Sequence, residues 1–214
     1  MQHIKLKVCG MKDLENIQAL ATLEPDYMGF IFYKESKRYV ANLVAEEVQQ
    51  LPAGIKATGV FVNADLQTIA EAVKEFSLSA IQLHGAETPE LCESLKIQFP
   101  DIEVIKAFGI DEEFNFDLLH TYDNVVDYFL FDTKTPAHGG SGKSFNWEKL
   151  KQYHGEKPYF LSGGIGLEHL DDIKALNHSA LYAIDINSKF ELEPGLKDIV
   201  QIKTFKTNLY GLEA

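Results

Sequence analysis

The chain of 214 residues has few cysteines and no long apolar run. Its two cysteines are too few for a disulfide framework, and no cysteine and histidine pair has the spacing of a zinc site, so no metal is expected. No apolar run reaches the roughly 18 residues of a transmembrane helix, and the N-terminus reaches charged residues before any long apolar stretch. We therefore expect a cytoplasmic protein with no membrane partner.

The chain also has few basic residues relative to acidic ones. Lys and Arg number 20 against 32 Asp and Glu, which gives a net charge of −12. A nucleic acid or an anionic membrane surface would be repelled, so we expect no nucleic-acid partner, and any small anion needs a local site. The remaining composition, 45% hydrophobic and 24% charged, is that of a folded protein, and the length fits one domain over residues 1–214.

Short β-branched runs alternate with amphipathic helical segments along the whole chain. Strands are predicted at 4–8, 26–32, 56–62, 79–83, 103–108, 128–132, 159–163 and 181–185. Helices are predicted at 14–23, 43–51, 66–76, 89–99, 167–176 and 195–208, while 111–123 has only a short apolar face. This alternation predicts an α/β fold with parallel strands. Eight units favour a single closed (β/α)8 barrel over a doubly wound open sheet.

In such a barrel, functional groups lie in the loops after the strands, and two strand ends carry groups suited to proton transfer. Cys9 ends the first strand and has two interpretations, a buried core thiol or a reactive group at the barrel mouth. Cys92, inside a helical segment, is expected to be a core residue. Asp132 ends an apolar run, where partial desolvation favours the protonated acid and a role as proton donor. It could instead cap a turn or a helix.

Other strand ends carry groups suited to binding. Arg38, after the second strand, could bind a carboxylate through its planar guanidinium or could simply be solvated. Gly163 and Gly164 lie at the end of the seventh strand, where backbone N–H groups can approach a phosphate at the start of a helix. Gln82 or His84 is expected to face the mouth after the fourth strand.

The segment at 133–145, TKTPAHGGSGKSF, is rich in glycine and polar residues. Such a composition is unsuited to a packing element. We predict that it is a mobile cover, which admits a substrate and then excludes water from it.

Several short motifs occur together in a fixed order. They are KVCGM at 7–11, S-x-R-x-V at 36–40, GVFVN at 59–63, IQLHG at 81–85, FDT with GGSG in 131–142, LSGGI at 161–165, and D-x-N-S-x-x-E with PG-x-KD in 185–198. This ordered set resembles the phosphoribosylanthranilate isomerase family over nearly the whole chain. The resemblance implies an Amadori rearrangement in tryptophan biosynthesis, from N-(5-phosphoribosyl)anthranilate to 1-(2-carboxyphenylamino)-1-deoxyribulose 5-phosphate. It also implies that no metal or organic cofactor takes part.

The resemblance assigns roles position by position. Cys9 matches the general base and Asp132 the general acid, while Arg38 matches the residue that holds the anthranilate carboxylate. The other matched residues are His84 and Asp185 for substrate binding, and Gly163, Gly164, Asn187 and Ser188 for phosphate binding. The sequence departs from the usual pattern at Lys37, Asn187 and Lys189. Both a monomer and a homodimer remain open.

Three alternatives remain at this stage. A phosphosugar epimerase would need His and Asp metal ligands at successive strand ends, and among the histidines only His84 stands at one. An indole-glycerol-phosphate synthase would use a lysine at a strand end, and Lys106 lies inside the fifth predicted strand. A catalytically silent barrel could bind a phosphorylated metabolite, although the presence of both Cys9 and Asp132 argues against it.

Overall fold

Residues 4–134 and 146–211 are described by a computed structural model, in which eight parallel strands form a closed barrel in sequence order. The strands are β1 (Lys5–Cys9), β2 (Tyr27–Ile31), β3 (Lys56–Phe61), β4 (Ala80–Leu83), β5 (Glu103–Ile110), β6 (Tyr128–Thr133), β7 (Tyr159–Leu161) and β8 (Leu181–Ile186). Pairing of β1 with β8 closes the ring. The predicted (β/α)8 barrel is confirmed, and the open sheet is excluded.

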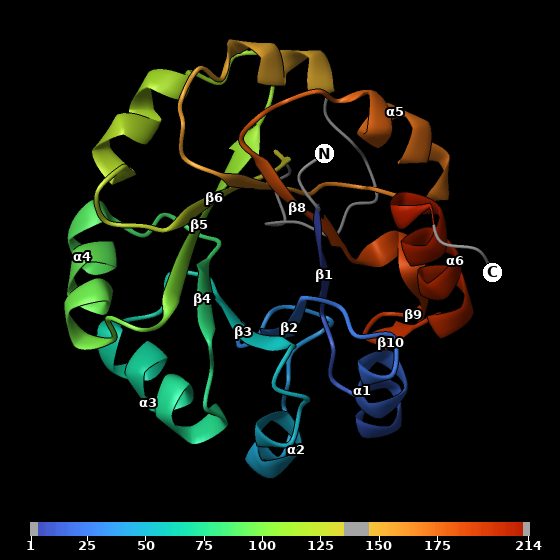
Figure 1. The fold of residues 1–214 in the computed structure, drawn as a ribbon. Coiled ribbons are helices and arrows are strands. Elements are labelled where there is room, and N and C mark those ends of the chain that lie inside the picture. Colours follow the sequence, from blue (N-terminus) through green and yellow to red (C-terminus); the bar gives the residue numbers. More distant parts are fainter. Residues whose placement is uncertain (1–3, 135–145, 212–214) are drawn as a thin grey trace.

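Helical segments surround the strands on the outside of the barrel (Figure 1). They are α1 (Leu14–Ala21), α2 (Ala45–Gln49), α3 (Leu66–Phe76), α4 (Pro89–Gln98), η1 (Phe116–Tyr122), η2 (Trp147–Gln152), η3 (Leu167–His169), α5 (Leu170–Ala175), η4 (Ser188–Phe190) and α6 (Ile199–Tyr210). The segment after β5 is the 3₁₀ helix η1, which agrees with the short apolar face predicted there. No helix in the described ranges is long and apolar enough to cross a membrane.

Aspartate side chains fix where several helices begin. Asp13, Asp65 and Asp198 each precede a helix and accept a hydrogen bond from a backbone N–H of its first turn. The last helix was predicted to begin at residue 195 but begins at Ile199. The cause is a small antiparallel pair, β9 (Glu191–Glu193) with β10 (Leu196–Lys197), which takes up the residues before it.

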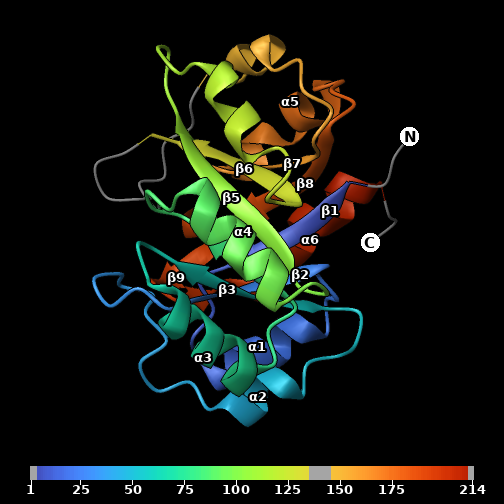
Figure 2. The same cartoon turned by 90° about the vertical axis from the view of Figure 1, so that its left-hand side faces the viewer.

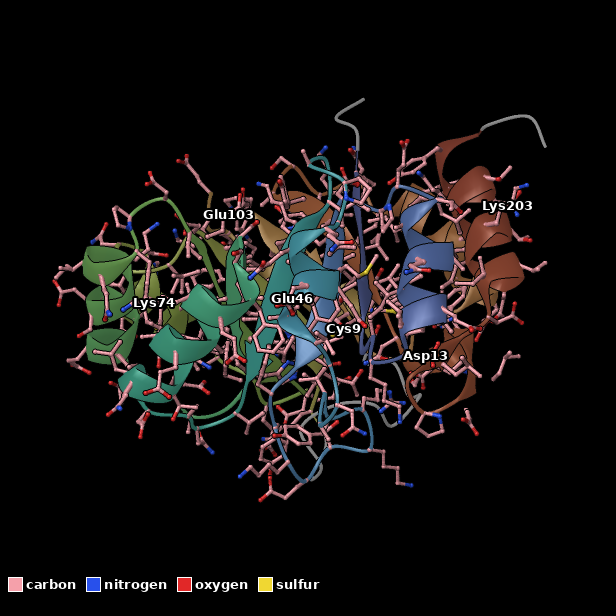
Figure 3. The ribbon with its side chains drawn as sticks, turned by 90° about the horizontal axis from the view of Figure 1, so that it is seen from below. Cys9, Asp13, Glu46, Lys74, Glu103 and Lys203 are labelled. Atoms are coloured by element: carbon pink, nitrogen blue, oxygen red, sulfur yellow. The ribbon has the colours of Figure 1, made fainter. Side chains whose placement is uncertain are left out.

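The interior of the barrel changes from apolar to polar along the strands. Inward positions near the N-terminal end form one apolar cluster of Tyr27, Ala80, Ile105, Ala107, Leu130, Phe160 and Ala183. Nearer the C-terminal end, the buried residues include Lys7, Thr58, Gln82, Asp132 and Asp185. In Figure 3, which views the barrel from its side, Glu103 at the start of β5 lies toward the upper end, and Cys9 at the end of β1 lies toward the lower end. The polar end is therefore the mouth expected to carry function.

Candidate active site

A cavity of about 460 Å³ opens at the C-terminal ends of the strands. It is lined by residues from strand ends and from the loops that follow them. Every residue predicted for the site lines this one cavity: Cys9, Arg38, His84, Asp132, Gly163, Gly164, Asp185, Asn187 and Ser188. The structure therefore brings together all the predicted site residues.

Cys9 is the last residue of β1, and only 4% of it is exposed. Its partner in the register of β2 is Gly29. A Cβ atom at Gly29 would lie 2.7 Å from the Cys9 Sγ, so the glycine leaves the space that the thiol occupies. Burial is the main cause that raises the pKa of the Cys9 thiol, and the neighbouring Lys7 ammonium opposes it. The thiol is therefore packed and also faces the cavity.

A buried ion pair lies beside Cys9 inside the barrel. The Lys7 Nζ lies 2.9 Å from the Asp185 Oδ1, and both side chains are almost fully buried. The Ser162 hydroxyl donates to the other Asp185 oxygen at 3.3 Å. Asp185 lines the cavity but Lys7 does not. Asp185 is therefore held from two sides by β1 and the residue after β7.

Asp132 is linked to the end of β4 through His84. The His84 Nε2 lies 3.2 Å from the Asp132 Oδ2, and the Thr133 N–H donates to the other carboxylate oxygen at 2.7 Å. The Gln82 amide nitrogen lies 2.7 Å from the His84 Nδ1. If that amide donates to Nδ1, the histidine proton is on Nε2 and points at Asp132.

The same three side chains can also form a chain of hydrogen bonds when Asp132 is protonated. The Gln82 Oε1 is buried and has no hydrogen-bond partner among the described residues. Rotation of the amide would let Oε1 accept from an Nδ1–H group, and Nε2 would then accept from the Asp132 acid. The sequence predicted that Gln82 or His84 would face the mouth; the structure shows that both line the cavity and that they contact each other.

Arg38 is not a solvated surface residue. Its side chain is 13% exposed, and its Nε and Nη2 bind the two carboxylate oxygens of Glu191 at 2.8 and 2.6 Å. Lys197 also binds Glu191, at 2.7 Å, and donates to the Asn187 side-chain oxygen at 2.6 Å. Burial lowers the pKa of Lys197 to about 8, although Glu191 opposes that shift. Figure 2 shows β9, which begins with Glu191, at the same end of the barrel as the loop after β2.

Glu191 and Lys197, which hold Arg38 and Asn187, are among the residues that sequence reasoning missed. Both belong to the motifs D-x-N-S-x-x-E and PG-x-KD, so the signal was present. A motif does not reveal which side chains pair, and Arg38 and Glu191 lie 153 positions apart.

The loops predicted to bind phosphate are tightly packed at the barrel mouth. Gly163 and Gly164 have φ values of 95° and 64°, which side chains rarely adopt. A Cβ at Gly163 would lie 2.9 Å from an Asp132 oxygen, so the β7 loop rests against the end of β6. The helix expected after these glycines is divided into η3 and α5. Lys189, one departure from the family pattern, pairs with Glu168 at 3.3 Å.

Lys106 lies away from the cavity, so it does not support the synthase alternative. Its side chain is 2% exposed, and its Nζ binds Glu87 at 3.1 Å. The same nitrogen donates to the carbonyls of Gly85 and Ala107 at 2.8 and 3.0 Å. The buried lysine thus ties β5 to the loop after β4.

Two other expectations bear on the site. Most of the predicted cover, residues 135–145, lies outside the described residues, and so does the GGSG motif. Among the described residues, no three His, Cys, Asp or Glu side chains gather in a way that could hold a metal ion. The absence of a metal stays a prediction.

Comparison with known proteins identifies the family. A family model of N-(5'-phosphoribosyl)anthranilate isomerase matches residues 6–208. The N-(5'-phosphoribosyl)anthranilate isomerase of Parabacteroides distasonis is 44% identical over 204 residues, which is 94% of this chain and 90% of that protein.

Solved structures agree with these matches. A crystal structure of phosphoribosylanthranilate isomerase in complex with reduced 1-(o-carboxyphenylamino)-1-deoxyribulose 5-phosphate is 30% identical, with a TM-score of 0.78, and the match covers 98% of this chain and 100% of that one. A structure of monomers generated from the dimeric enzyme of Thermotoga maritima has the same identity and coverage, with a TM-score of 0.77. The chain belongs to the N-(5'-phosphoribosyl)anthranilate isomerase family.

Proposed function

We propose that Cys9 and Asp132 are the proton-transfer pair with which this chain isomerises N-(5'-phosphoribosyl)anthranilate. The activity is that of the family, a step of tryptophan biosynthesis. The assignment of individual residues is supported chiefly by one observation. The thiol and the carboxyl group come from strands separated by β7 and β8 in the ring, and both face the same cavity. We further propose that residues 1–214 form a single catalytic domain.

The first step needs an acid at the ribose ring oxygen. Asp132 donates its proton to that oxygen, the bond between C1 and the oxygen breaks, and the nitrogen lone pair forms a C1=N iminium. The His84 tautomer with its proton on Nε2, in which Nδ1 accepts from the Gln82 amide, can donate to the new Asp132 carboxylate. The contact of 3.2 Å between them supports this exchange.

The second step needs a base at C2. The Cys9 thiolate removes the C2 proton, the electron pair forms a C1=C2 bond, and the iminium electrons return to nitrogen. The resulting enolamine gains a proton at C1 and loses its hydroxyl proton, which gives the ketone. Atoms and charge balance, as they must in an isomerisation.

The remaining residues bind the substrate in this proposal. Because Glu191 occupies the Nε and Nη2 edge of Arg38, the anthranilate carboxylate would meet the Nη1 side of the guanidinium. The phosphate would lie against Gly163, Gly164, Asn187 and Ser188, whose loops flank the cavity. Asp185, held by Lys7 and Ser162, would contact the sugar or order the site. No cofactor is invoked.

Loss of phosphoribosylanthranilate fluorescence on mixing with purified protein tests the activity directly. Asp132→Asn should lower kcat by about 10²–10⁴ while substrate still binds, because the amide cannot donate the required proton. Glu148→Gln is a matched control, since Glu148 is an exposed carboxylate on η2. A wild-type protein that leaves the fluorescence unchanged would remove the proposed function.

We also propose a cytoplasmic protein that acts on a small phosphosugar and not on nucleic acid. The related Thermotoga maritima enzyme is described as dimeric. A homodimer and a monomer are both compatible with the cavity, because its described lining comes from one chain. Light scattering after gel filtration distinguishes the two.

A further inference from the structure

The buried Lys7 is a charged group near Cys9 that the steps above do not use. It is 0% exposed and does not line the cavity, so it cannot touch a substrate there. A buried ammonium is costly unless it is paired and hydrogen bonded. Its partners therefore indicate what it does.

Lys7 lies between two groups that can each carry negative charge. Lys7 and Cys9 are two residues apart on β1, so both point into the barrel. Lys7 pairs in register with Asp185 on β8, and its Nζ binds that carboxylate at 2.9 Å. Its ammonium also interacts electrostatically with the Cys9 thiol. One ammonium thus serves a carboxylate and a thiol.

We propose that Lys7 is a positioning residue that stabilises Cys9 as the thiolate, and that Asp185 competes with this thiolate for the same ammonium. The inference rests on the proposed function only in that Cys9 is taken as the base. A thiolate next to Lys7 gains a charge-assisted hydrogen bond without leaving the apolar barrel. Asp185 keeps Lys7 charged and in place while the thiol is protonated.

Other charges act on Cys9, but none is placed like Lys7. Lys197 and Arg38 both interact with the thiol through their charge, and both are hydrogen bonded to Glu191. Asp185 raises the pKa of the Cys9 thiol, and Lys7 lowers it more strongly than Lys197 does. Burial still leaves the pKa raised, so the thiolate is the minority form near neutral pH.

A titration of the Cys9 thiol tests the inference without any turnover. In a Cys92→Ala background, Cys9 is the only thiol, and thiolate ultraviolet absorbance and alkylation by iodoacetamide follow its ionisation. Lys7→Met should raise the midpoint by about 1–3 pH units, the usual effect of losing a close opposite charge. Asp185→Asn should lower the midpoint, because Lys7 is then left to the thiolate. Opposite shifts are expected, and general damage to the fold would not produce them.

Lys7→Met leaves the Asp185 carboxylate buried without its partner, so this variant could fail to fold. In that event Asp185→Asn alone tests the inference. A Cys9 midpoint that is unchanged or higher in this variant overturns it. The matched control is the paired change Lys106→Met with Glu87→Gln, which removes a buried lysine and its carboxylate that lie away from the cavity. The Cys9 midpoint should not move there, and an equal shift would also overturn the inference.

Activity supplies a second readout. At pH values between the ionisations of Asp132 and Cys9, Lys7→Met should lower kcat by about tenfold for each pH unit by which the Cys9 midpoint rises. The ratio of variant to wild-type kcat should return toward one above the new midpoint, because both proteins then hold the thiolate. A ratio that stays low at every pH would mean that Lys7 is only structural. If the wild type has no isomerase activity, the proposed function fails, and the thiol titration still tests Lys7.

Discussion

Two buried groups in the described part of the chain can be compared, because each contains a lysine, a carboxylate and a cysteine. The inner group is Lys7 and Asp185 beside Cys9, within the barrel. The outer group is Lys106 and Glu87, which act electrostatically on the thiol of Cys92 in α4. Only the inner group has members that line the cavity. Similar sets of side chains therefore border the cavity in one place and lie away from it in the other.

The two groups also differ in how their hydrogen bonds are supplied. Lys106 donates to backbone carbonyls of the β4 loop and of β5, and Glu87 accepts the N–H groups of Gly85 and Asn63. The polar atoms of Lys106 and Glu87 thus have backbone partners and need no ligand. In the inner group, side chains contact side chains, and a change of protonation in one alters the others. Fixed backbone partners thus favour an anchor, and side-chain partners favour a site that can change state.

The largest expected effect separates the two cysteines. Cys9→Ala should lower kcat by about 10²–10⁴ while the protein stays folded, the usual loss for a positioned base. Cys9→Ser should fall nearly as far, because a hydroxyl ionises far less readily than a thiol. Cys92→Ala should retain kcat and lose about 1 kcal/mol of stability through lost packing.

Steady-state kinetics and urea unfolding of the three variants check this. If Cys9→Ser keeps most of the wild-type rate, Cys9 is a packing residue like Cys92. The base would then have to be sought elsewhere, beginning with His84.

The outer ion pair should matter for stability more than for rate. Lys106→Met leaves Glu87 as an uncompensated buried charge, which costs about 3–5 kcal/mol in the free energy of unfolding. The double variant with Glu87→Gln should recover much of this loss, since no charge is then left alone. Denaturant unfolding measures the energies, and kcat per folded molecule should be retained in both variants. A folded Lys106→Met protein with full stability but little activity would place Lys106 in the chemistry after all.

Much of this comparison was open to prediction from sequence, and part of it was not. The barrel followed from alternating strand and helix patterns, and the strand-end rule placed Cys9, Asp132 and Arg38 at the mouth. The pairing of Lys7 with Asp185 could not be predicted from these patterns, because the two residues are 178 positions apart and meet only when β8 pairs with β1. Strand alternation predicts which way a side chain points. It does not predict which side chain stands opposite.

Arg38 at the rim of the same mouth should affect binding more than chemistry. Arg38→Ala should raise KM by about 10–100-fold, the worth of a hydrogen bond to a charged group, with kcat changed much less. The contact with a substrate carboxylate is largely the same in the ground and transition states. Steady-state kinetics check the split, and Lys74→Ala on the outer helix α3 (Figure 3) controls for loss of one positive charge. An unchanged KM would show that the guanidinium serves only Glu191.

The smallest effect expected concerns pH. A carboxylic acid ordinarily ionises below a thiol. The active form, in which the acid is protonated and the thiol is ionised, is therefore a minority of the protein. Its fraction is constant at pH values between the two pKa values. The rate should fall on the acid side as the thiolate is lost, and on the alkaline side as the fraction of protonated acid declines beyond the thiol midpoint.

The alkaline limb of kcat therefore reports the Cys9 thiol, although both limbs belong to the coupled pair. Because burial raises the pKa of this thiol, the limb should lie above the ordinary thiol value of about 8.5. Burial also raises the pKa of Cys92 to about 11, but its ionisation should not enter the profile, since Cys92 is outside the cavity. Cys92→Ala should thus leave the alkaline limb in place. An alkaline limb that moves in Cys92→Ala would mean that Cys92 takes part in the chemistry. A limb that lies below the ordinary thiol value in the wild type would mean that burial does not control the ionisation of Cys9. Either result would contradict the distinction between the inner and outer groups.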